Sequence, residues 1–393
     1  MKILSVNAGS SSLKFQAYEM PEERVLISGN FERIGNTNDS FYTIKINGEK
    51  IEKKAPLSNH EDAVNLLTEE LLNNNIVKSL DEIKGIGHRV VAGGDIFNSS
   101  VILDDEKIQQ ISDLSVLAPL HNPGAVIGMK AFKRFIPGAI GTAVFDTAFH
   151  QTMSPSTYLY ALPYEWYTKY KVRRYGAHGT SHKFVAIRLS EILNKNDAKV
   201  IVCHIGNGAS ITAVDSLKCV DTSMGFTPNA GVIMGTRCGD IDASIIPYMM
   251  KQADLSASDI DRIINKESGL LGISRISNDH RDIEHGIENN DEMCILAEKM
   301  YIRRIVDYIA KYYVLLGGVD AIAFTAGVGE NSYQVRKRVI DSLKVLGIKL
   351  DEEANKVMGR EALITTSDSS IPCYVIPTDE ELMIARDTYN LVK

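Results

Sequence analysis

The amino-acid sequence predicts an α/β protein built from two similar halves that face each other across a cleft. Two stretches, residues 3–18 and 199–214, share one pattern: a short apolar strand, a polar loop with glycine, and a second strand. Predicted strands and helices alternate through the rest of the chain, which is typical of α/β architecture. The length of 393 residues suffices for two or three domains.

In the first half, strands are predicted at residues 3–6, 13–18, 41–46 and 140–145. Residues 41–46 alternate apolar and polar side chains, as a strand with one buried face does. Val64, Leu67 and Leu71 recur at helical spacing and predict a helix with one face in the core.

In the second half, strands are predicted at residues 200–203, 211–214, 321–324 and 374–376. Residues 291–316 carry apolar side chains at helical spacing and predict a long helix. Its predicted core face consists of Leu296, Met300, Ile305, Ile309 and Tyr312. A last helix is predicted at residues 380–391, where Thr378 as N-cap and Glu381 three residues later form a capping box.

Composition and charge narrow the possible partners. Hydrophobic residues make up 44% and charged residues 24%, and the formal net charge is −7. This acidic balance argues against nucleic acid or an anionic membrane as the main partner. The five cysteines are odd in number and form no C-x-x-C motif, which argues against disulfides or a cysteine zinc site and favours a reducing cytoplasm. The apolar run at the N-terminus is too short for a signal peptide, and no later stretch predicts a membrane span.

Glycine-bearing turns follow three short apolar strands, at Gly9, at Gly206 with Gly208, and at Gly327 with Gly329. Glycine lets backbone N–H groups approach phosphate oxygens, the hydroxyls of Ser10, Ser12 and Ser210 add donors, and Lys14 adds positive charge. A Walker-type loop is excluded because no G-x-x-x-x-G-K-[ST] motif occurs. One such turn alone is best interpreted as a hairpin, but three together favour phosphate binding. Asn331 is interpreted as part of a helix N-terminus that would suit an anion.

The opening segment Asn7-Ala8-Gly9-Ser10-Ser11-Ser12-Leu13-Lys14-Phe15 resembles the signature of the acetate kinase family, which belongs to the larger group with actin and hexokinase. The resemblance continues, in order, at residues 87–91, 121–123, 145–150, 175–182, 204–210, 234–240, 327–331 and 378–382. It implies two actin/hexokinase-like (ribonuclease H-like) domains and a homodimer. It also implies reversible, Mg-dependent phosphoryl transfer between ATP and acetate, giving acetyl phosphate and ADP by direct in-line transfer.

The resemblance also implies how the domains divide. Residues 1–149 plus about 382–393 would form an N-terminal, acyl-side domain to which the C-terminal helix returns. Residues 150–381 would form a C-terminal domain for nucleotide binding and dimerisation.

Two arginines in turn-rich contexts are candidates for binding anions. Arg89 follows an apolar strand and Arg237 lies in a turn flanked by glycines. An isolated arginine more often forms a surface salt bridge, but the planar guanidinium also suits carboxylate and phosphate oxygens. By resemblance, Arg89 binds the carboxylate of the acid and Arg237 stabilises the transferring phosphoryl group.

Asp146 follows the predicted buried strand at residues 140–145. Two interpretations are open: a carboxylate that takes part in catalysis, or a structural cap of a helix or turn. The resemblance makes it the essential acidic residue of the site. A carboxylate substrate has a pKa of about 4 to 5 and needs no deprotonation at neutral pH. Asp146 is therefore expected to orient other groups and to assist Mg²⁺ and proton placement rather than to act as a general base.

Four histidines are candidates. His178 and His182 are four residues apart, a spacing that suits zinc, but Gly179 between them and the absence of an H-E-x-x-H motif argue against a zinc pair. His178 is instead predicted to donate a hydrogen bond to phosphoryl oxygens. His121 and His204 are candidates for acid-side and phosphate-side contacts, or are satisfied structural histidines.

The remaining site assignments are implied by the resemblance alone. Asn7 and Glu380 would act around Mg²⁺, for which Mn²⁺ can substitute, through waters. The apolar wall for the acid would be Val91, Leu120 and Pro228. Nucleotide binding would involve Ser10, Ser12, Lys14, His204, Ile205, Gly206, Asn207, Gly208, Asp279, His280, Arg281, Gly327, Val328, Gly329, Glu330 and Asn331.

Ala177 stands where the family usually has phenylalanine, which predicts a wider acyl pocket and better turnover of propionate. Ala92, the pair Asn229-Ala230 and Cys238 are further departures, and none removes a charged catalytic group. Propionate kinase is the close alternative and butyrate kinase a weaker one. An actin-like ATPase would bind ATP without needing Arg89 or Arg237, and a metal hydrolase would use His178 and His182.

Overall fold

The computed structural model describes all 393 residues and divides the chain into two compact units. Unit 1 consists of Met1–Phe149 and Asp379–Lys393, and unit 2 consists of His150–Thr378. The C-terminal segment therefore returns to the unit in which the chain begins. None of the helices has both the length and the hydrophobicity that a membrane-spanning segment needs.

Unit 1 is built on an eight-stranded sheet with the order β5-β4-β3-β2-β1-β6-β8-β7. The strands are β1 (Lys2–Ala8), β2 (Ser12–Glu19), β3 (Arg24–Glu32), β4 (Phe41–Ile46), β5 (Glu49–Lys54), β6 (Ile83–Val90), β7 (Val101–Ile102) and β8 (Ile140–Phe145). The α-helices are α1 (His60–Asn73), α2 (Asp105–Asp113), α3 (Asn122–Phe135) and α14 (Glu380–Val392). β1 pairs with β6 and β6 with β8 in parallel, so the carboxyl ends of these three strands meet at one edge.

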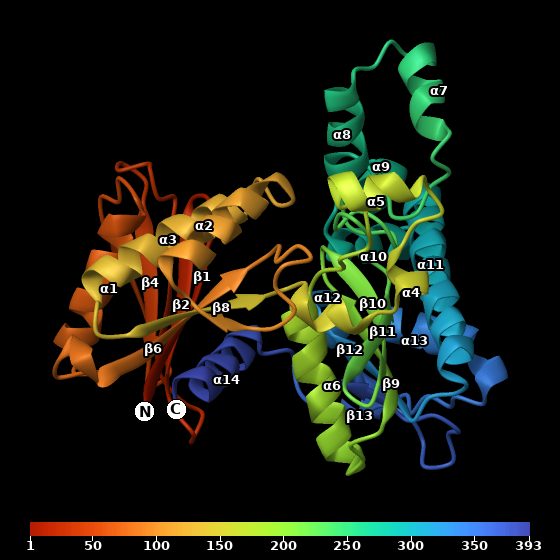
Figure 1. The fold of residues 1–393 in the computed structure, drawn as a ribbon. Coiled ribbons are helices and arrows are strands. Elements are labelled where there is room, and N and C mark those ends of the chain that lie inside the picture. The colour runs from red at the N-terminus through yellow and green to blue at the C-terminus, as the bar shows by residue number, and fades with distance from the viewer. The chain divides into compact units, whose positions relative to one another are not determined.

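Alternation along β1 directs its side chains to two different cores. Leu4 and Val6 belong to the cluster that contains Phe132 of α3, whereas Ile3 packs in a cluster with Ala385 of α14. Helices therefore cover both faces of this sheet (Figure 1). The close approach of α14 requires glycine in β6, because a Cβ at Gly87 would lie 2.6 Å from the Ile384 side chain.

Unit 2 repeats this plan with a six-stranded sheet in the order β11-β10-β9-β12-β14-β13. Its strands are β9 (Lys199–Ile205), β10 (Ala209–Asp215), β11 (Lys218–Thr222), β12 (Ala321–Thr325), β13 (Ala362–Leu363) and β14 (Cys373–Val375). Its α-helices are α4 (Pro155–Tyr158), α5 (Tyr164–Tyr170), α6 (Gly179–Leu193), α7 (Ile245–Gln252), α8 (Ala257–Lys266), α9 (Gly269–Ser274), α10 (His280–Glu288), α11 (Glu292–Leu316), α12 (Ala326–Asn331) and α13 (Tyr333–Ser342).

The two sheets share one topology. In unit 1, β1, β2 and β3 form an antiparallel meander, and β6 and β8 continue the sheet in parallel on the other side of β1. In unit 2, β9, β10 and β11 form the meander, and β12 and β14 are the parallel strands. The prediction of two similar α/β halves is therefore confirmed.

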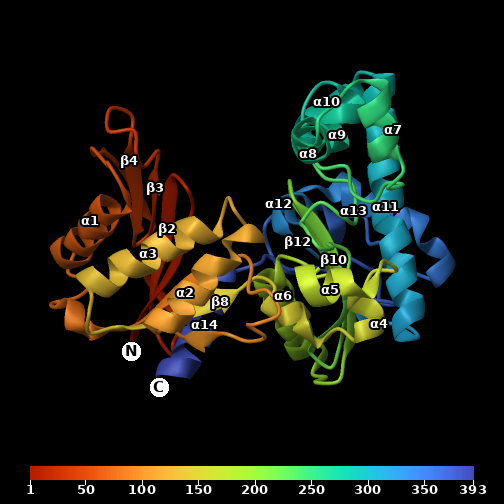
Figure 2. The ribbon, with the colours of Figure 1, turned by 45° about the horizontal axis from the view of Figure 1, so that its top comes forward.

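Alternation along β9 places the functional face of unit 2. Ile201, Cys203 and Ile205 lie in the cluster that contains Tyr301 of α11. His204 points to the opposite face, towards α6, and Figure 2 shows α6 and α11 on either side of this sheet. One strand thus contributes a core face and a polar face.

The predicted core face of α11 is partly wrong. Leu296 and Met300 are 44% and 40% exposed, while Cys294, Ala297 and Tyr301 are buried. The buried stripe that continues to Ile305 and Ile309 keeps steps of three and four residues. The predicted step of five residues from Met300 to Ile305 does not fit the helical period. At the start of the helix the buried positions are taken by the small residues Cys294 and Ala297 in place of a large apolar side chain.

The predicted capping box at the start of α14 is also wrong. Asp379, not Thr378, is the N-cap, and its carboxylate accepts a hydrogen bond from the Leu382 N–H at 2.8 Å. Asp379 also lies 3.4 Å from the Tyr18 hydroxyl, so tertiary contact favours it over the neighbouring threonine. Glu381 forms an ion pair with Lys14 instead of closing a box.

The stability of unit 1 should depend on pH through His88. This histidine is buried against the Phe132 ring, with ring centroids 5.6 Å apart, and burial lowers its pKa to about 3. Below the ordinary pKa of about 6.5 the unfolded chain binds a proton that the folded chain does not, so stability is lost as pH falls from about 6.5 towards 3. The slope from this one group is about 1.4 kcal/mol per pH unit.

His88→Gln should flatten that pH dependence, measured by urea unfolding at several pH values between 5 and 7.5. His285→Gln is the control, because the His285 side chain is exposed on α10. An unchanged slope in His88→Gln, with a normal slope in the control, would contradict this account.

Candidate active site

The acidic cluster of unit 1 forms where β6 and β8 end. Arg89 donates to Asp146 through Nε, at 3.1 Å, and through Nη2, at 2.6 Å. This is the two-point geometry that fixes a guanidinium in orientation. Asp146 is only 2% exposed, and Glu380 lies 4.0 Å from the Arg89 Nε. The structure therefore brings together three predicted site residues within unit 1.

The charges in this cluster are not balanced. Asp146, Glu380 and Glu381 share two cations, Arg89 and Lys14. The Asp146 carboxylate raises the pKa of Arg89 above its usual value. Burial, together with Asp146 and Glu381, raises the pKa of Glu380 to about 7 against the opposing effect of Arg89. Negative charge is in surplus here, so a hard cation would be stabilised.

Mg²⁺ prefers oxygen donors, and unit 1 offers the Glu380 carboxylate and the amide oxygen of half-buried Asn7 at the end of β1. The surplus negative charge around Glu380 fits a divalent cation. The residues present therefore suit the metal assigned to them by resemblance.

The first glycine loop is held tightly between β1 and β2. The Gly9 N–H donates to the Ser12 carbonyl at 2.9 Å, and the Gly9 carbonyl contacts His60 Nε2 at 2.8 Å. A Cβ at Gly124 of α3 would lie 2.7 Å from the same carbonyl, so glycine permits the close packing. Ser10 is exposed on this turn. The loop is thus a hairpin turn in which Ser10 is exposed and the Ser12 hydroxyl lies over Gly9, 2.9 Å from where a Cβ would be.

The predicted acid-side residues are divided between the units. Val91 is half-buried just after β6, and His121 and Leu120 precede α3, with Leu120 70% exposed. Pro228 lies in unit 2, where its carbonyl accepts a hydrogen bond from Arg237 Nη1 at 3.2 Å. The apolar wall that these residues would form stays a prediction.

The cationic centre of unit 2 lies over the second glycine loop. A Cβ at Gly208 would be 3.2 Å from Arg237 Nη1 and 3.4 Å from His178 Nε2. The three predicted residues therefore converge, and only glycine leaves room for both side chains. Arg237 has no carboxylate partner, and burial lowers its pKa. An unpaired, partly buried guanidinium beside a glycine loop is a strong site for an anion.

Histidines form the wall behind this centre. The rings of His178 and His204 stack with centroids 4.1 Å apart and an interplanar angle of 22°. His182 is fully buried and contacts Ser210 Oγ through Nε2 at 2.6 Å. Burial first, and then the three neighbouring histidines, lower the pKa of His182 well below its usual value. His182 is therefore neutral and structural.

A cavity of about 880 Å³ in unit 2 is lined by half of the residues predicted to bind the nucleotide. Those that line it are Gly206, Asn207, Asp279, His280, Arg281, Gly327, Val328 and Asn331. Ile205 is instead fully buried in the hydrophobic core, and Gly329 packs against the backbone of β9 and β12. Gly235 also lines the cavity, where a Cβ would clash with the Asn207 side chain.

In the third glycine loop, one prediction is wrong, and one predicted nucleotide contact is bonded within its own chain. Asn331 ends α12 rather than beginning a helix, and its amide donates to the Gly327 carbonyl at 2.9 Å. The Glu330 carboxylate accepts from the N–H groups of Ala326 at 2.7 Å and Thr378 at 3.1 Å. Ala326 has a φ of 65°, so this carboxylate holds a left-handed turn in place.

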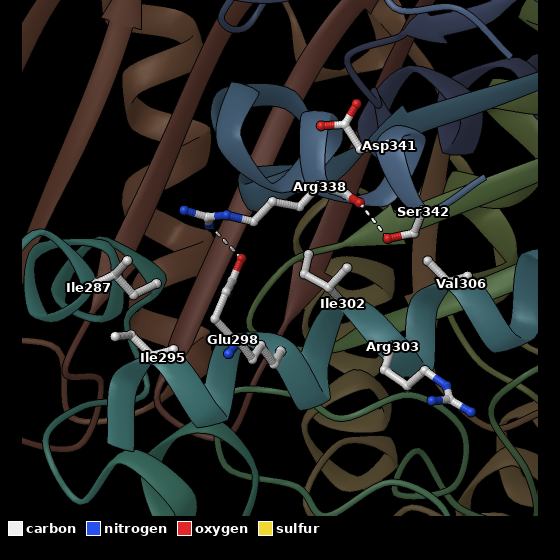
Figure 3. A pocket seen from close by; sticks show the side chains of 10 residues that line it. Ile287, Ile295, Glu298, Ile302, Arg303, Val306, Arg338, Asp341 and Ser342 are labelled. Atoms are coloured by element: carbon white, nitrogen blue, oxygen red, sulfur yellow. Dashed lines mark hydrogen bonds and ion pairs between the residues drawn. The ribbon is translucent and has the colours of Figure 1, made fainter. Parts of the chain in front are cut away.

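A charged network behind the cavity had no signal in the sequence. Glu298 of α11 contacts His280 Nε2 at 2.9 Å. Glu298 also accepts from Arg338 of α13 at 2.7 Å, as Figure 3 shows. Arg338 also donates to Glu284, which lines the cavity. Burial raises the pKa of Glu298, but its bonds to His280 and Arg338 outweigh that effect and lower it. The four side chains of this network come from three helices, α10, α11 and α13, so no local motif reveals them.

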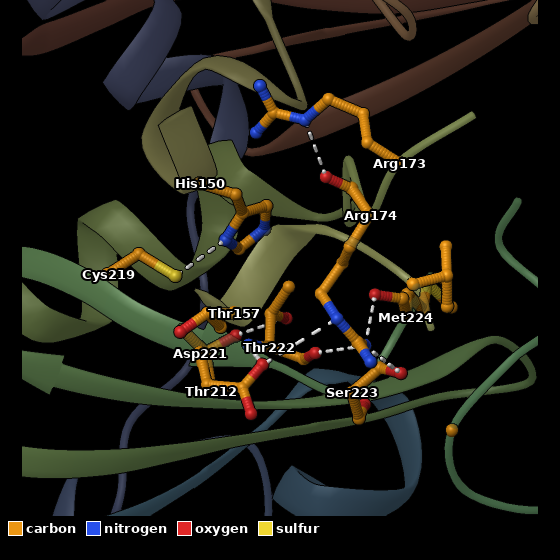
Figure 4. A network of polar contacts seen from close by, with 12 residues as sticks. His150, Thr157, Arg173, Arg174, Thr212, Cys219, Asp221, Thr222, Ser223 and Met224 are labelled. Atoms are coloured by element: carbon orange, nitrogen blue, oxygen red, sulfur yellow. Dashed lines mark hydrogen bonds and ion pairs between the residues drawn. The ribbon is translucent and has the colours of Figure 1, made fainter. Parts of the chain in front are cut away.

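Arg174 was also missed, and it fixes the segment that leads to His178. Its Nη1 points at the carbonyls of residues 222–224, at 2.7 to 3.1 Å, and Asp221 lies 3.7 Å from its Nε (Figure 4). The next two backbone N–H groups both donate to the Gly225 carbonyl, at 3.0 and 3.1 Å. This clamp joins the segment before His178 to the one before Pro228.

Comparison with known proteins agrees with this geometry. The family model described as the acetokinase family matches residues 2–386. The chain belongs to the acetokinase family. It is 52% identical to the acetate kinase of Bacillus subtilis (strain 168) over 394 residues, covering 100% of each chain.

Solved structures of this family have the same fold. The acetate kinase of Porphyromonas gingivalis matches with a TM-score of 0.95 and 42% identity over 100% of both chains. A propionate kinase from Francisella tularensis matches with a TM-score of 0.93 and 40% identity, again over 100% of both chains. The predicted family membership and the two-domain actin/hexokinase-like fold are therefore confirmed.

Replacing Arg174 with methionine should destabilise unit 2 strongly. Hydrogen bonds from a charged donor are worth roughly 1.5–3 kcal/mol each, and the carbonyls left behind are buried, so a loss of about 3 kcal/mol or more is expected. Urea unfolding provides the measurement. Arg188→Met is the matched control, because Arg188 pairs with Glu361 and Glu191 at the surface and should cost under about 1 kcal/mol. Equal losses in the two variants would refute the clamp.

Proposed function

We propose that this chain catalyses reversible phosphoryl transfer between ATP and acetate, giving acetyl phosphate and ADP. The observation that carries the proposal is Arg237, a partly buried guanidinium without a carboxylate partner beside the glycine loop at Gly208. Such a guanidinium can bind an anion and stabilise the negative charge that accumulates on it during phosphoryl transfer. Membership of the acetokinase family supplies the acceptor, the carboxylate of a small acid.

Unit 1 is proposed to hold the acid. The bonds from Arg89 to Asp146 use Nε and Nη2, which leaves Nη1 to bind the acid's carboxylate. Asp146 is therefore a positioning residue that fixes the direction of the guanidinium. The acid is already ionised at neutral pH, so the attacking oxygen needs no general base. Val91, Leu120, His121 and, from unit 2, Pro228 are proposed to contact the acid.

Unit 2 is proposed to hold the nucleotide in the cavity lined by Gly206, Asp279 and Gly327. Arg237 and His178 would stabilise the transferring phosphoryl group, because both converge on Gly208. The serine hydroxyls of the first loop and Lys14 of unit 1 remain proposed phosphate contacts. The Glu330 carboxylate is bonded to its own chain, so its proposed contribution is to hold the third loop.

Asn7 and Glu380 are proposed to hold Mg²⁺, or Mn²⁺ in its place, largely through waters. When bound, the ion would neutralise charge on the phosphate oxygens. Asp146 is bonded to Arg89 in two places, whereas Glu380 lies near Arg89 without such a two-point bond. Glu380 is therefore the carboxylate of this cluster that is proposed to hold the metal.

We also infer a cytoplasmic homodimer. All five cysteines are unpaired, as is usual for proteins of reducing compartments. Large apolar side chains are exposed on two short helices of unit 2: Tyr164, Trp166 and Tyr170 on α5, and Ile245 and Tyr248 on α7. Exposed apolar groups of this size are typical of surfaces that another protein covers.

An assay over formate, acetate, propionate and butyrate tests the reaction class and the acyl preference. Acetate should give the highest kcat/KM, as the family membership implies. Propionate should come second, because Ala177 stands where the family usually has a larger side chain, and one methylene is worth about 1–3 kcal/mol in such pockets. A higher value for propionate would reassign the chain to propionate kinase. No acyl phosphate from any acid, with ATP hydrolysis intact, would favour the actin-like ATPase.

Arg237→Ala should lower kcat with acetate by roughly 10³ to 10⁵, as for other arginines that stabilise phosphoryl transfer. The measurement is acyl-phosphate formation at saturating ATP and acetate. Arg303→Ala is the control, since Arg303 is exposed on α11 and pairs only with Asp307. Turnover of Arg237→Ala within tenfold of the wild type would exclude the assigned role.

A further inference from the structure

Two hydroxyl groups form a hydrogen-bonded series that ends on His204, in β9 just before the second glycine loop. The Thr378 hydroxyl donates to Ser181 Oγ at 2.8 Å, and Ser181 Oγ lies 2.8 Å from His204 Nδ1. The three residues come from the end of unit 2, from α6 and from β9. Ser181 is fully buried and His204 is 6% exposed, so the hydrogen bond between them is shielded from water.

Counting protons along this series fixes the tautomer of the imidazole. A serine hydroxyl carries one hydrogen and two lone pairs. Because Ser181 accepts from Thr378, its own hydrogen is free to donate to His204 Nδ1. Nδ1 can accept only if it carries no proton, and the proton of the neutral ring must then be on Nε2. The reversed order, with Ser181 donating to Thr378, would require the opposite tautomer.

The position of Thr378 is itself fixed by the third glycine loop. Its backbone N–H donates to Glu330 Oε1 at 3.1 Å, and the same oxygen accepts from the Ala326 N–H at 2.7 Å. Thr378 is therefore connected to the third loop through its backbone, and to His204, which precedes the second loop, through its side chain and Ser181. Both loops carry residues that line the cavity of unit 2.

We propose that Thr378 and Ser181 are positioning residues that hold neutral His204 as the Nε2–H tautomer, so that this ring presents a donor to a phosphate oxygen of the nucleotide. The inference rests on the proposed function, since it names how one residue of that site is prepared. A phosphate has only acceptors, and an unprotonated ring nitrogen would repel it. His204 stacks on His178, whose Nε2 lies over Gly208, which places the two imidazoles at the same loop.

The test compares Thr378→Val, which keeps the shape and the backbone N–H but removes the hydroxyl, with Thr378→Ser, which keeps both. Long-range ¹H–¹⁵N correlation spectra of the full chain with labelled histidine distinguish protonated from unprotonated ring nitrogens. His204→Gln assigns the resonance. The wild type and Thr378→Ser should show Nε2–H for His204 at a pH where the ring is neutral. Thr378→Val should show a mixture of tautomers.

The same variants should separate in ADP affinity, measured by calorimetry. The ADP dissociation constant should rise as the fraction of rings with the proton on Nε2 falls. An even mixture of tautomers in Thr378→Val should therefore weaken ADP binding about twofold, and Thr378→Ser should match the wild type. If Thr378→Val does not fold, Ser181→Ala removes the acceptor and should give the same mixture. A wild type with Nδ1–H, or a folded variant without the hydroxyl series that retains Nε2–H alone, would overturn the proposal.

The spectra need neither nucleotide nor turnover. If the wild type makes no acyl phosphate, the proposed function fails while the tautomer result stands. If it makes acyl phosphate but the tautomer does not respond to Thr378→Val, only the inference fails.

Discussion

The central constraint in this protein is the contrast between two arginines. Arg89 is bound in two places by Asp146, which raises its pKa and fixes its orientation. Arg237 has no carboxylate, and burial lowers its pKa. A partly buried charge without a partner is unfavourable unless an anion supplies one. The first arginine is therefore suited to directing a ligand, and the second to gaining stability as negative charge arrives.

The duplicated topology explains why each unit offers one such centre. In both sheets, a meander is followed by parallel strands whose carboxyl ends meet at one edge. Arg89 and Asp146 use that edge in unit 1, and His204 and the third glycine loop use it in unit 2. Ligands commonly bind at the carboxyl ends of parallel strands in open α/β sheets. The shared backbone plan carries different side chains, with a surplus of acid in one unit and an unpaired cation in the other.

Local patterns predicted much of this from the sequence, and the failures have physical causes. Residues 41–46 and 140–145 were correctly predicted as strands because alternation and apolar runs are local signals. The cap of α14 was misassigned because Thr378 and Asp379 are both good N-caps, and a distant contact with Tyr18 favours the second. The Glu298–Arg338 pair is 40 residues apart in the chain and leaves no periodic trace. Glu330 lies in a predicted ligand motif, yet its carboxylate serves the loop itself.

In the segment 378–381, where the chain leaves unit 2, each of four consecutive residues has its own structural role. Thr378 bonds to Ser181 and Glu330, Asp379 caps α14, and Glu380 and Glu381 join the cluster around Arg89 and Lys14. The chain passes from unit 2 to unit 1 between the first and second of these residues. Each side chain therefore satisfies a different partner, and a shift of the helix start by one residue would break all of these contacts together. A capping box at Thr378 would have used its hydroxyl within the helix, so the cap at Asp379 is what frees that hydroxyl for Ser181.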